Sequence, residues 1–150
     1  LREKYRLQDL RELERAMVMM ESQIRFLSVP LSEVLENISY QTGGQVGMLM
    51  EETAKAMAER TGETAEQIWE AVWMRHISHT YLSGEDYQSI LRFGKTLGYL
   101  DQEQQKNSTE LFLTELRQKC GQIERRLEKN GRLYYSMGFL GGLMLVIVLL

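Results

Sequence analysis

The stretch LRELERAMVMMESQIRFL, residues 10–27, decides the fold of this chain. Its apolar residues are spaced three and four positions apart, which is the spacing of a coiled-coil seam. The opposite face is charged, and Pro30 stops the helix because the residue before a proline avoids the helical region. The pattern therefore predicts a long first helix that packs against another helix along one apolar stripe. The stripe consists of Leu10, Leu13, Met17, Met20, Ile24 and Leu27.

A second long helix with a matching stripe is expected from about residue 102 to Asn130. Asp101 and Gln104 form an N-cap and N3 pair at its start. We expect the two long helices to pack antiparallel, which brings both ends of the chain to the same side. The stripe of the second helix consists of Phe112, Leu116, Cys120, Ile123 and Leu127.

About four short helices are predicted between the two long ones. Gly43, Gly62 and Gly98 end short apolar-periodic segments, and Ser28, Thr64 and Ser83 are candidate N-caps. The chain has one proline and no convincing alternation of apolar and polar residues, so no strand is expected. The predicted fold class is all-α, a single helical bundle over residues 1–132 with two long antiparallel helices.

The last eighteen residues, LYYSMGFLGGLMLVIVLL at 133–150, carry no charged side chain. As a helix they extend roughly 27 Å, close to a hydrocarbon core of about 30 Å. They are therefore predicted to form a transmembrane helix, with Tyr134 at the interface and Gly138, Gly141 and Gly142 where membrane helices pack. The alternative is a buried core helix, for which 132 further residues are barely enough.

The charges that flank this run predict its orientation. Residues 117–132 carry six basic and two acidic side chains, a net of +4, and basic flanks stay on the cytoplasmic side. The bundle is therefore expected in the cytoplasm, and the single cysteine, Cys120, fits a reducing compartment. Arg2, Lys4 and Arg6 are the expected flank of an upstream transmembrane helix that this chain lacks.

Few residues indicate catalysis. His76 and His79 are three apart and bind a metal only if a third ligand joins them; solvated histidines are the alternative reading. Cys120 lies in an apolar stripe and is assigned to packing. No phosphate-binding loop is present. We therefore assign no catalytic, cofactor-binding or metal-binding residue and expect no enzyme activity.

The charge pattern points to protein partners. The net charge is −3 and no basic stripe is present, so nucleic-acid binding is not expected. Residues 33–70 carry eight acidic and two basic side chains, a net of −6. This acidic segment is either an ordinary solvated surface or a docking face for a basic partner.

The segment from Gly94 to Gln105 is the predicted partner-binding surface. A connection between helices needs only one stop and one cap, and Gly98 and Asp101 supply them. The segment nevertheless displays further polar and aromatic side chains, although a well-capped solvated turn is the alternative. The predicted partner-binding residues are Lys95, Tyr99, Asp101, Gln102, Gln104 and Gln105.

Three stretches together resemble stage III sporulation protein AB of endospore-forming bacteria: PLSEVLENIS at 30–39, FGKTLGYLDQEQQ at 93–105 and MGFLGGLMLVIVLL at 137–150. Members of that family have an N-terminal hydrophobic segment that this chain lacks. The resemblance implies a place in the membrane complex that links mother cell and forespore, similar to the inner-membrane platform protein of type II secretion and type IV pilus machines.

The same resemblance implies a non-catalytic adaptor in the mother-cell membrane around the forespore, with its helical domain facing the cytoplasm. By analogy with the secretion machines, the adaptor couples a cytoplasmic ATPase, stage III sporulation protein AA, to the other membrane proteins of the complex. A coiled-coil membrane tether or dimeric scaffold without ATPase contact is equally compatible with the heptad spacing and remains the alternative.

Overall fold

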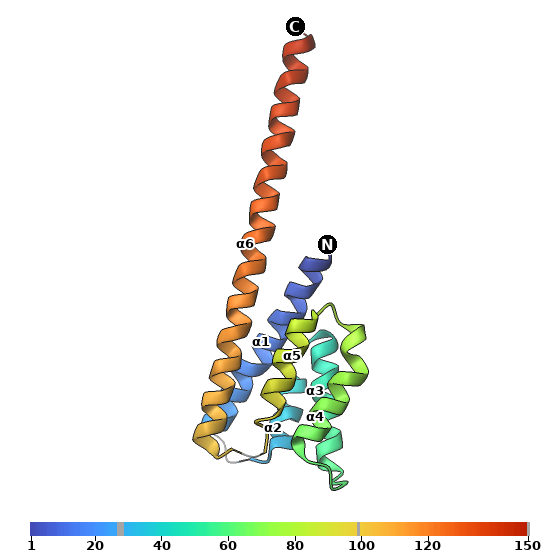
Figure 1. Cartoon of the computed structure of the whole chain (residues 1–150), viewed down its shortest axis with the longest axis vertical. Coiled ribbons are helices and arrows are strands. Elements are labelled where there is room, and N and C mark those ends of the chain that lie inside the picture. The colour runs from blue at the N-terminus through green and yellow to red at the C-terminus, as the bar shows by residue number, and fades with distance from the viewer. Residues whose placement is uncertain (27–28, 99, 150) are drawn as a thin grey trace.

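The computed structural model describes the backbone of residues 1–26, 29–98 and 100–149, and the side chains of these residues except 131–146 and 148–149. Within these ranges the chain forms six α-helices and one 3-10 helix, with no strand (Figure 1). The all-helical architecture agrees with the sequence pattern. The elements are α1 (Arg2–Phe26), α2 (Leu31–Ser39), α3 (Gly44–Ala58), α4 (Ala65–His76), η1 (Ile77–His79), α5 (Gly84–Gly94) and α6 (Gln102–Leu149).

The two long helices, α1 and α6, lie side by side and run in opposite directions, as predicted (Figure 1). Two ion pairs show that the helices are antiparallel, because the earlier residue of α1 pairs with the later residue of α6. Glu3 lies 3.3 Å from Arg126, and Glu14 lies 3.4 Å from Arg117. The predicted stripes form the contact. On α1 the stripe residues Leu10, Leu13, Met17 and Met20 are 0% exposed. On α6 the buried stripe residues are Phe112, Leu116, Cys120 and Ile123.

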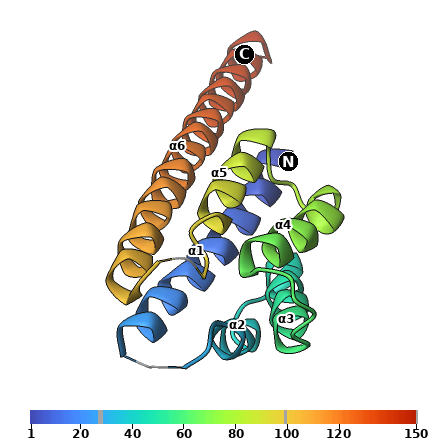
Figure 2. The ribbon, with the colours of Figure 1, turned by 60° about the horizontal axis from the view of Figure 1, so that its bottom comes forward.

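Helices α2 and α3 contact α1, and α5 contacts both α4 and α6, so the short helices form a layer against the α1–α6 pair (Figure 2). Helices α2, α3, α4 and α5 pack on one another in chain order. Trp69 and Trp73 of α4 are fully buried, and Trp69 Nε1 donates a hydrogen bond to the carbonyl of Ile90, 3.0 Å away. The core thus continues from the α1–α6 contact into the layer of short helices.

Two of the predicted caps are present. Thr64 with Gln67 begins α4, and Ser83 with Asp86 begins α5; each pair makes both hydrogen bonds of a capping box. The start of α2 differs from the prediction, because Pro30 is the residue that precedes its first turn. The predicted cap, Ser28, lies outside the described residues.

The prediction of a transmembrane helix at 133–150 is wrong for this structure. Among the residues that the structure describes, no helix is both long enough and apolar enough to cross a bilayer. Helix α6 continues without a break through Asn130 and Gly131 to Leu149, so the charge-free run is the last part of a helix of 48 residues. The residues assigned to the membrane, Tyr134, Gly138, Gly141 and Gly142, have side-chain environments outside the described residues.

Candidate partner-binding surface

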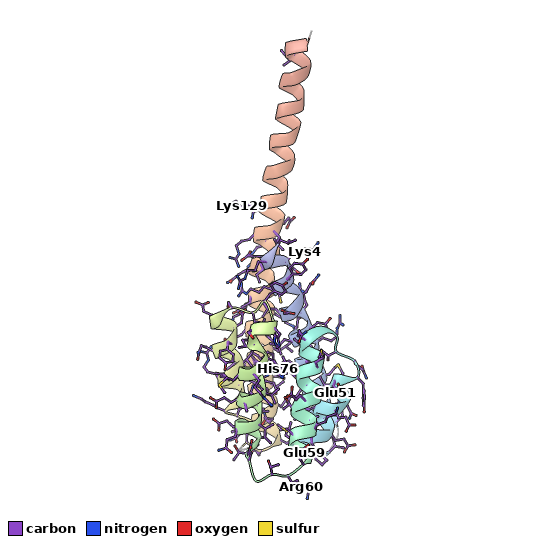
Figure 3. All side chains as sticks on the ribbon, turned by 90° about the vertical axis from the view of Figure 1, so that its right-hand side faces the viewer. Lys4, Glu51, Glu59, Arg60, His76 and Lys129 are labelled. Carbon is purple, nitrogen blue, oxygen red and sulfur yellow. The ribbon has the colours of Figure 1, made fainter. Side chains whose placement is uncertain are left out.

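The predicted partner-binding segment lies at the end of the bundle opposite to the end from which α6 projects (Figure 1). We call this the distal end. It comprises the connection between α5 and α6, the loop between α3 and α4, and Val29 and Pro30 before α2. Figure 3 places Glu59 and Arg60 of the α3–α4 loop at this end, and Lys4 and Lys129 at the other.

Buried contacts hold the first half of the α5–α6 connection. Leu97 is fully buried, and Gly98 has a φ of 80°, which a side chain other than glycine rarely adopts. Thr96 Oγ1 donates to the Phe93 carbonyl at 2.7 Å and accepts from Ser108 Oγ at 2.9 Å. Residues 96–98 therefore form a turn that is packed and hydrogen-bonded into the fold.

Gln105 belongs to this buried network and not to the surface. It is 8% exposed, and its Nε2 lies 3.4 Å from Thr96 Oγ1. Gln102 has a mixed role, because it is exposed yet donates a hydrogen bond from Nε2 to the carbonyl of Ile24 at the end of α1. That bond ties the start of α6 to the end of α1.

Four predicted residues lie exposed at the distal end: Lys95, Asp101, Gln102 and Gln104. Asp101 Oδ1 accepts a hydrogen bond from the backbone N–H of Gln104 at 2.8 Å, which is the predicted cap of α6. No side-chain bond is described for Lys95 or Gln104. Tyr99 lies outside the described residues. The connection therefore offers a small polar display on a rigid support.

A hollow of about 310 Å³ adjoins this display. Its apolar side comes from Ile24, Leu31, Val34 and Leu100, and its polar side includes Asp101 and Gln102. Sequence reasoning missed the hollow because its lining comes from the end of α1, from α2 and from the α5–α6 connection. Only the fold brings these three segments together.

The acidic segment of the sequence, residues 33–70, forms α2, α3 and the first half of α4. Some of its charge is neutralised locally: Glu51 lies 3.0 Å from Lys55, and Glu52 lies 3.2 Å from Arg75. In the described part of the chain the other carboxylates have no ion-pair partner, so this face carries a net negative potential. They are Glu33, Glu36, Glu59, Glu63, Glu66 and Glu70.

An ionic cluster around the buried Asp86 joins three helices. The sequence predicted only the pairing of Asp86 with Ser83 at the start of α5. Asp86 of α5 is 1% exposed and accepts two hydrogen bonds from the Arg6 guanidinium of α1, at 2.8 and 2.9 Å. Nζ of Lys119, on α6, lies 3.2 Å from Asp86 Oδ1. Burial alone raises the pKa of Asp86, but the bonds from Arg6 and from the Ser83 backbone lower it to about 2. This cluster fixes α5 relative to the two long helices.

The surroundings of His76, His79 and Cys120 favour neither a metal site nor a reactive thiol. His76 Nε2 lies 2.5 Å from Glu52 Oε2, and the His76 and His79 rings are 5.7 Å apart. No set of three potential metal-ligating side chains comes together among the described residues. Cys120 is fully buried, and burial raises the pKa of its thiol, which disfavours the reactive thiolate.

Comparison with known proteins gives concordant matches. The family model described as stage III sporulation protein AB matches residues 1–150. Stage III sporulation protein AB of Bacillus subtilis (strain 168) is 27% identical over 141 residues, which are 94% of this chain and 82% of that protein. A solved structure of stage III sporulation protein AB superimposes with a TM-score of 0.76 at 23% identity, over 83% of this chain and 98% of that one. At that identity the structural match shows the fold alone.

Proposed function

The chain belongs to the stage III sporulation protein AB family and so has a role in sporulation, and from that premise we propose that it is a non-catalytic adaptor of the complex that links mother cell and forespore. In this proposal the distal end of the bundle binds a cytoplasmic ATPase, the companion stage III sporulation protein AA. The opposite end works with the other membrane proteins of the complex, at the mother-cell membrane around the forespore, and the helical bundle faces the cytoplasm.

The observation that carries the proposal is the construction of the distal end. A connector needs only a stop and a cap, whereas this one is anchored by Leu97, Thr96 and Gln105 and bonded to α1 through Gln102. Lys95 and Gln104 are left exposed on that support with no described role in the fold. Polar groups held on a rigid element lose little entropy when a partner binds them.

The neighbouring surface supports a partner with a basic and partly apolar contact face. The hollow beside Asp101 offers an apolar recess of about 310 Å³, and the unpaired carboxylates of α2, the α3–α4 loop and α4 favour approach of a cationic surface. An adaptor that transmits force or movement also needs a stiff body. The α1–α6 pair and the Asp86 cluster provide that stiffness along the whole bundle.

A pull-down with purified ATPase tests the proposal. The double variant Lys95→Ala with Gln104→Ala removes two exposed side chains. Its free energy of unfolding should stay within about 0.5 kcal/mol of the wild-type value. It should reduce ATPase capture at least fivefold. The matched control, Lys129→Ala with Gln88→Ala, removes the same residue types elsewhere and should capture the ATPase like the wild type.

The outcomes separate the adaptor from its alternative. Equal capture by the double variant and by its control would remove the assigned surface. If the wild-type chain captures no ATPase but sediments as a dimer, the chain is a tether or dimeric scaffold and the adaptor proposal fails. Loss of folding in the double variant would instead assign Lys95 and Gln104 to structure.

A further inference from the structure

Exposed basic side chains gather at the end of the bundle from which α6 projects. We call Arg2, Lys4, Arg125, Arg126 and Lys129 the basic collar. All five are exposed, and Figure 3 shows Lys4 and Lys129 at this end. Arg126 lies 3.3 Å from Glu3, whereas the other four have no ion pair among the described residues. Cations that form no ion pair within the described part of the chain are available to an anionic ligand.

Part of the collar lies on one open face of α6. Arg125, Arg126 and Lys129 share this face with Gln122. The guanidinium group presents a planar fork of N–H donors that matches two oxygens of a phosphate. Lysine and glutamine add further donors. This face therefore has the donor set for a phosphate-bearing group.

An exposed aromatic pair lies beside the collar. Tyr5 of α1 stacks on Tyr81, with ring centres 4.8 Å apart, and the two residues are 38% and 45% exposed. The backbone N–H of Tyr81 donates to Asp9 Oδ2 at 2.8 Å, which holds the turn against α1. The pair is not part of the core cluster. Rings with an apolar body and a polar hydroxyl are enriched where protein meets lipid head groups.

We propose that the basic collar and the Tyr5–Tyr81 pair form a docking surface for the head groups of anionic phospholipids. The charge distribution supports this choice of ligand, because six carboxylates without an ion pair in the described ranges lie on α2, the α3–α4 loop and α4, away from the collar, where an anionic surface would repel them. Docking then orients the bundle with its distal end pointing away from the lipid. The inference extends the proposed function, which sets the chain at a membrane, but it does not depend on the ATPase.

Vesicle co-sedimentation of the full chain tests this surface. The probes are phosphatidylcholine vesicles with and without phosphatidylglycerol. The collar variant Lys4→Gln, Arg125→Gln, Lys129→Gln is compared with a control, Arg25→Gln, Lys55→Gln, Arg92→Gln, which removes three positive charges from exposed positions outside the collar. Residues 133–150 are identical in all three chains, so any binding that they contribute is common to all.

The partition coefficient of the collar variant onto phosphatidylglycerol vesicles should be about a hundredfold lower than that of the wild type. Each of the three removed basic residues contributes roughly a fivefold factor near an anionic surface. The control should partition like the wild type, and all three chains should melt alike. Raising the salt concentration should weaken the wild-type preference.

Three results would overturn the inference. One is equal partition of the collar and control variants. Another is equal binding of the wild type to both kinds of vesicle. The last is binding of inorganic phosphate, or self-association, that depends on the collar without any preference for phosphatidylglycerol, because the site would then recognise a free anion or a second copy. None of these results bears on ATPase capture, which fails or succeeds separately.

Discussion

Asp86 shows how one residue serves both local and long-range structure. Its carboxylate accepts the Ser83 N–H in the capping box of α5 and also binds Arg6, eighty positions away. The cap was predictable, because a serine followed three residues later by a suitable acceptor is a local pattern. The partners Arg6 and Lys119 were not, because nothing in the sequence pairs charges on α1 and α6 with α5.

The Asp86→Asn variant should lower the free energy of unfolding by about 3 kcal/mol, because two partly buried cations, Arg6 and Lys119, are left without a counter-charge. Chemical denaturation at neutral pH measures the loss. Glu85→Gln, at the exposed neighbouring position, is the control and should change stability by less than about 0.5 kcal/mol. Similar values for both variants would show that the cluster contributes little.

The same carboxylate predicts an acid-dependent loss of stability. The pKa of Asp86 falls from 3.8 to about 2 on folding, so its contribution is complete above pH 3.8 and is lost as the pH falls toward 2. The shift corresponds to about 2 kcal/mol. Between pH 5 and pH 2 the melting temperature of Asp86→Asn should therefore decrease less than that of the wild type. Equal decreases for the two chains would contradict the assignment.

Gly94 is a second residue whose role only the packing reveals. A Cβ at this position would lie 2.3 Å from Cδ1 of the buried Trp69, whereas a Cβ at Gly84 meets nothing within 4 Å. Gly94→Ala should therefore destabilise the chain by about 1–3 kcal/mol, and Gly84→Ala should be neutral or slightly stabilising. Thermal unfolding of the two single variants makes the comparison; equal melting temperatures would mean that Trp69 moves aside without cost.

At the level of elements, the long helices were the most predictable part of the fold. The spacing of apolar residues over 10–27 and 112–127 is a strong periodic signal, and the structure buries residues of both stripes in one contact, from Leu10 to Met20 and from Phe112 to Ile123. Leu27 lies outside the described residues. The charge-free run at 133–150 misled the prediction, because absence of charge does not by itself make a spanning helix, and this run continues a charged one. The distal hollow was unpredictable, since three separate segments line it.

Met17→Asp or Leu116→Asp should destabilise the bundle by several kcal/mol, on the order of 3–5, because each places an unpaired carboxylate in the α1–α6 contact. Val18→Asp provides the control on the same helix, since Val18 is 42% exposed. It should change stability by less than about 1 kcal/mol. Melting temperatures for Met17→Asp and Leu116→Asp that match that of Val18→Asp would show that the stripes do not hold the helices together.

The whole molecule has two different ends. Cations surround the end from which α6 projects, and the distal end joins a rigid polar connection to a hollow and an acidic flank. An adaptor between a membrane and a cytoplasmic ATPase needs this polarity, because each partner must find its own end of the bundle. The antiparallel α1–α6 pair sets the axis along which the two ends are separated.

Crosslinking with mass spectrometry on native membranes tests the central claim most directly, because lysines mark both ends. Lys95 and Lys106 lie near the distal end, and Lys4 and Lys129 belong to the basic collar. The adaptor account predicts crosslinks from Lys95 or Lys106 to the ATPase, and none from Lys4 or Lys129 to it. ATPase crosslinks confined to Lys4 and Lys129 would contradict the account.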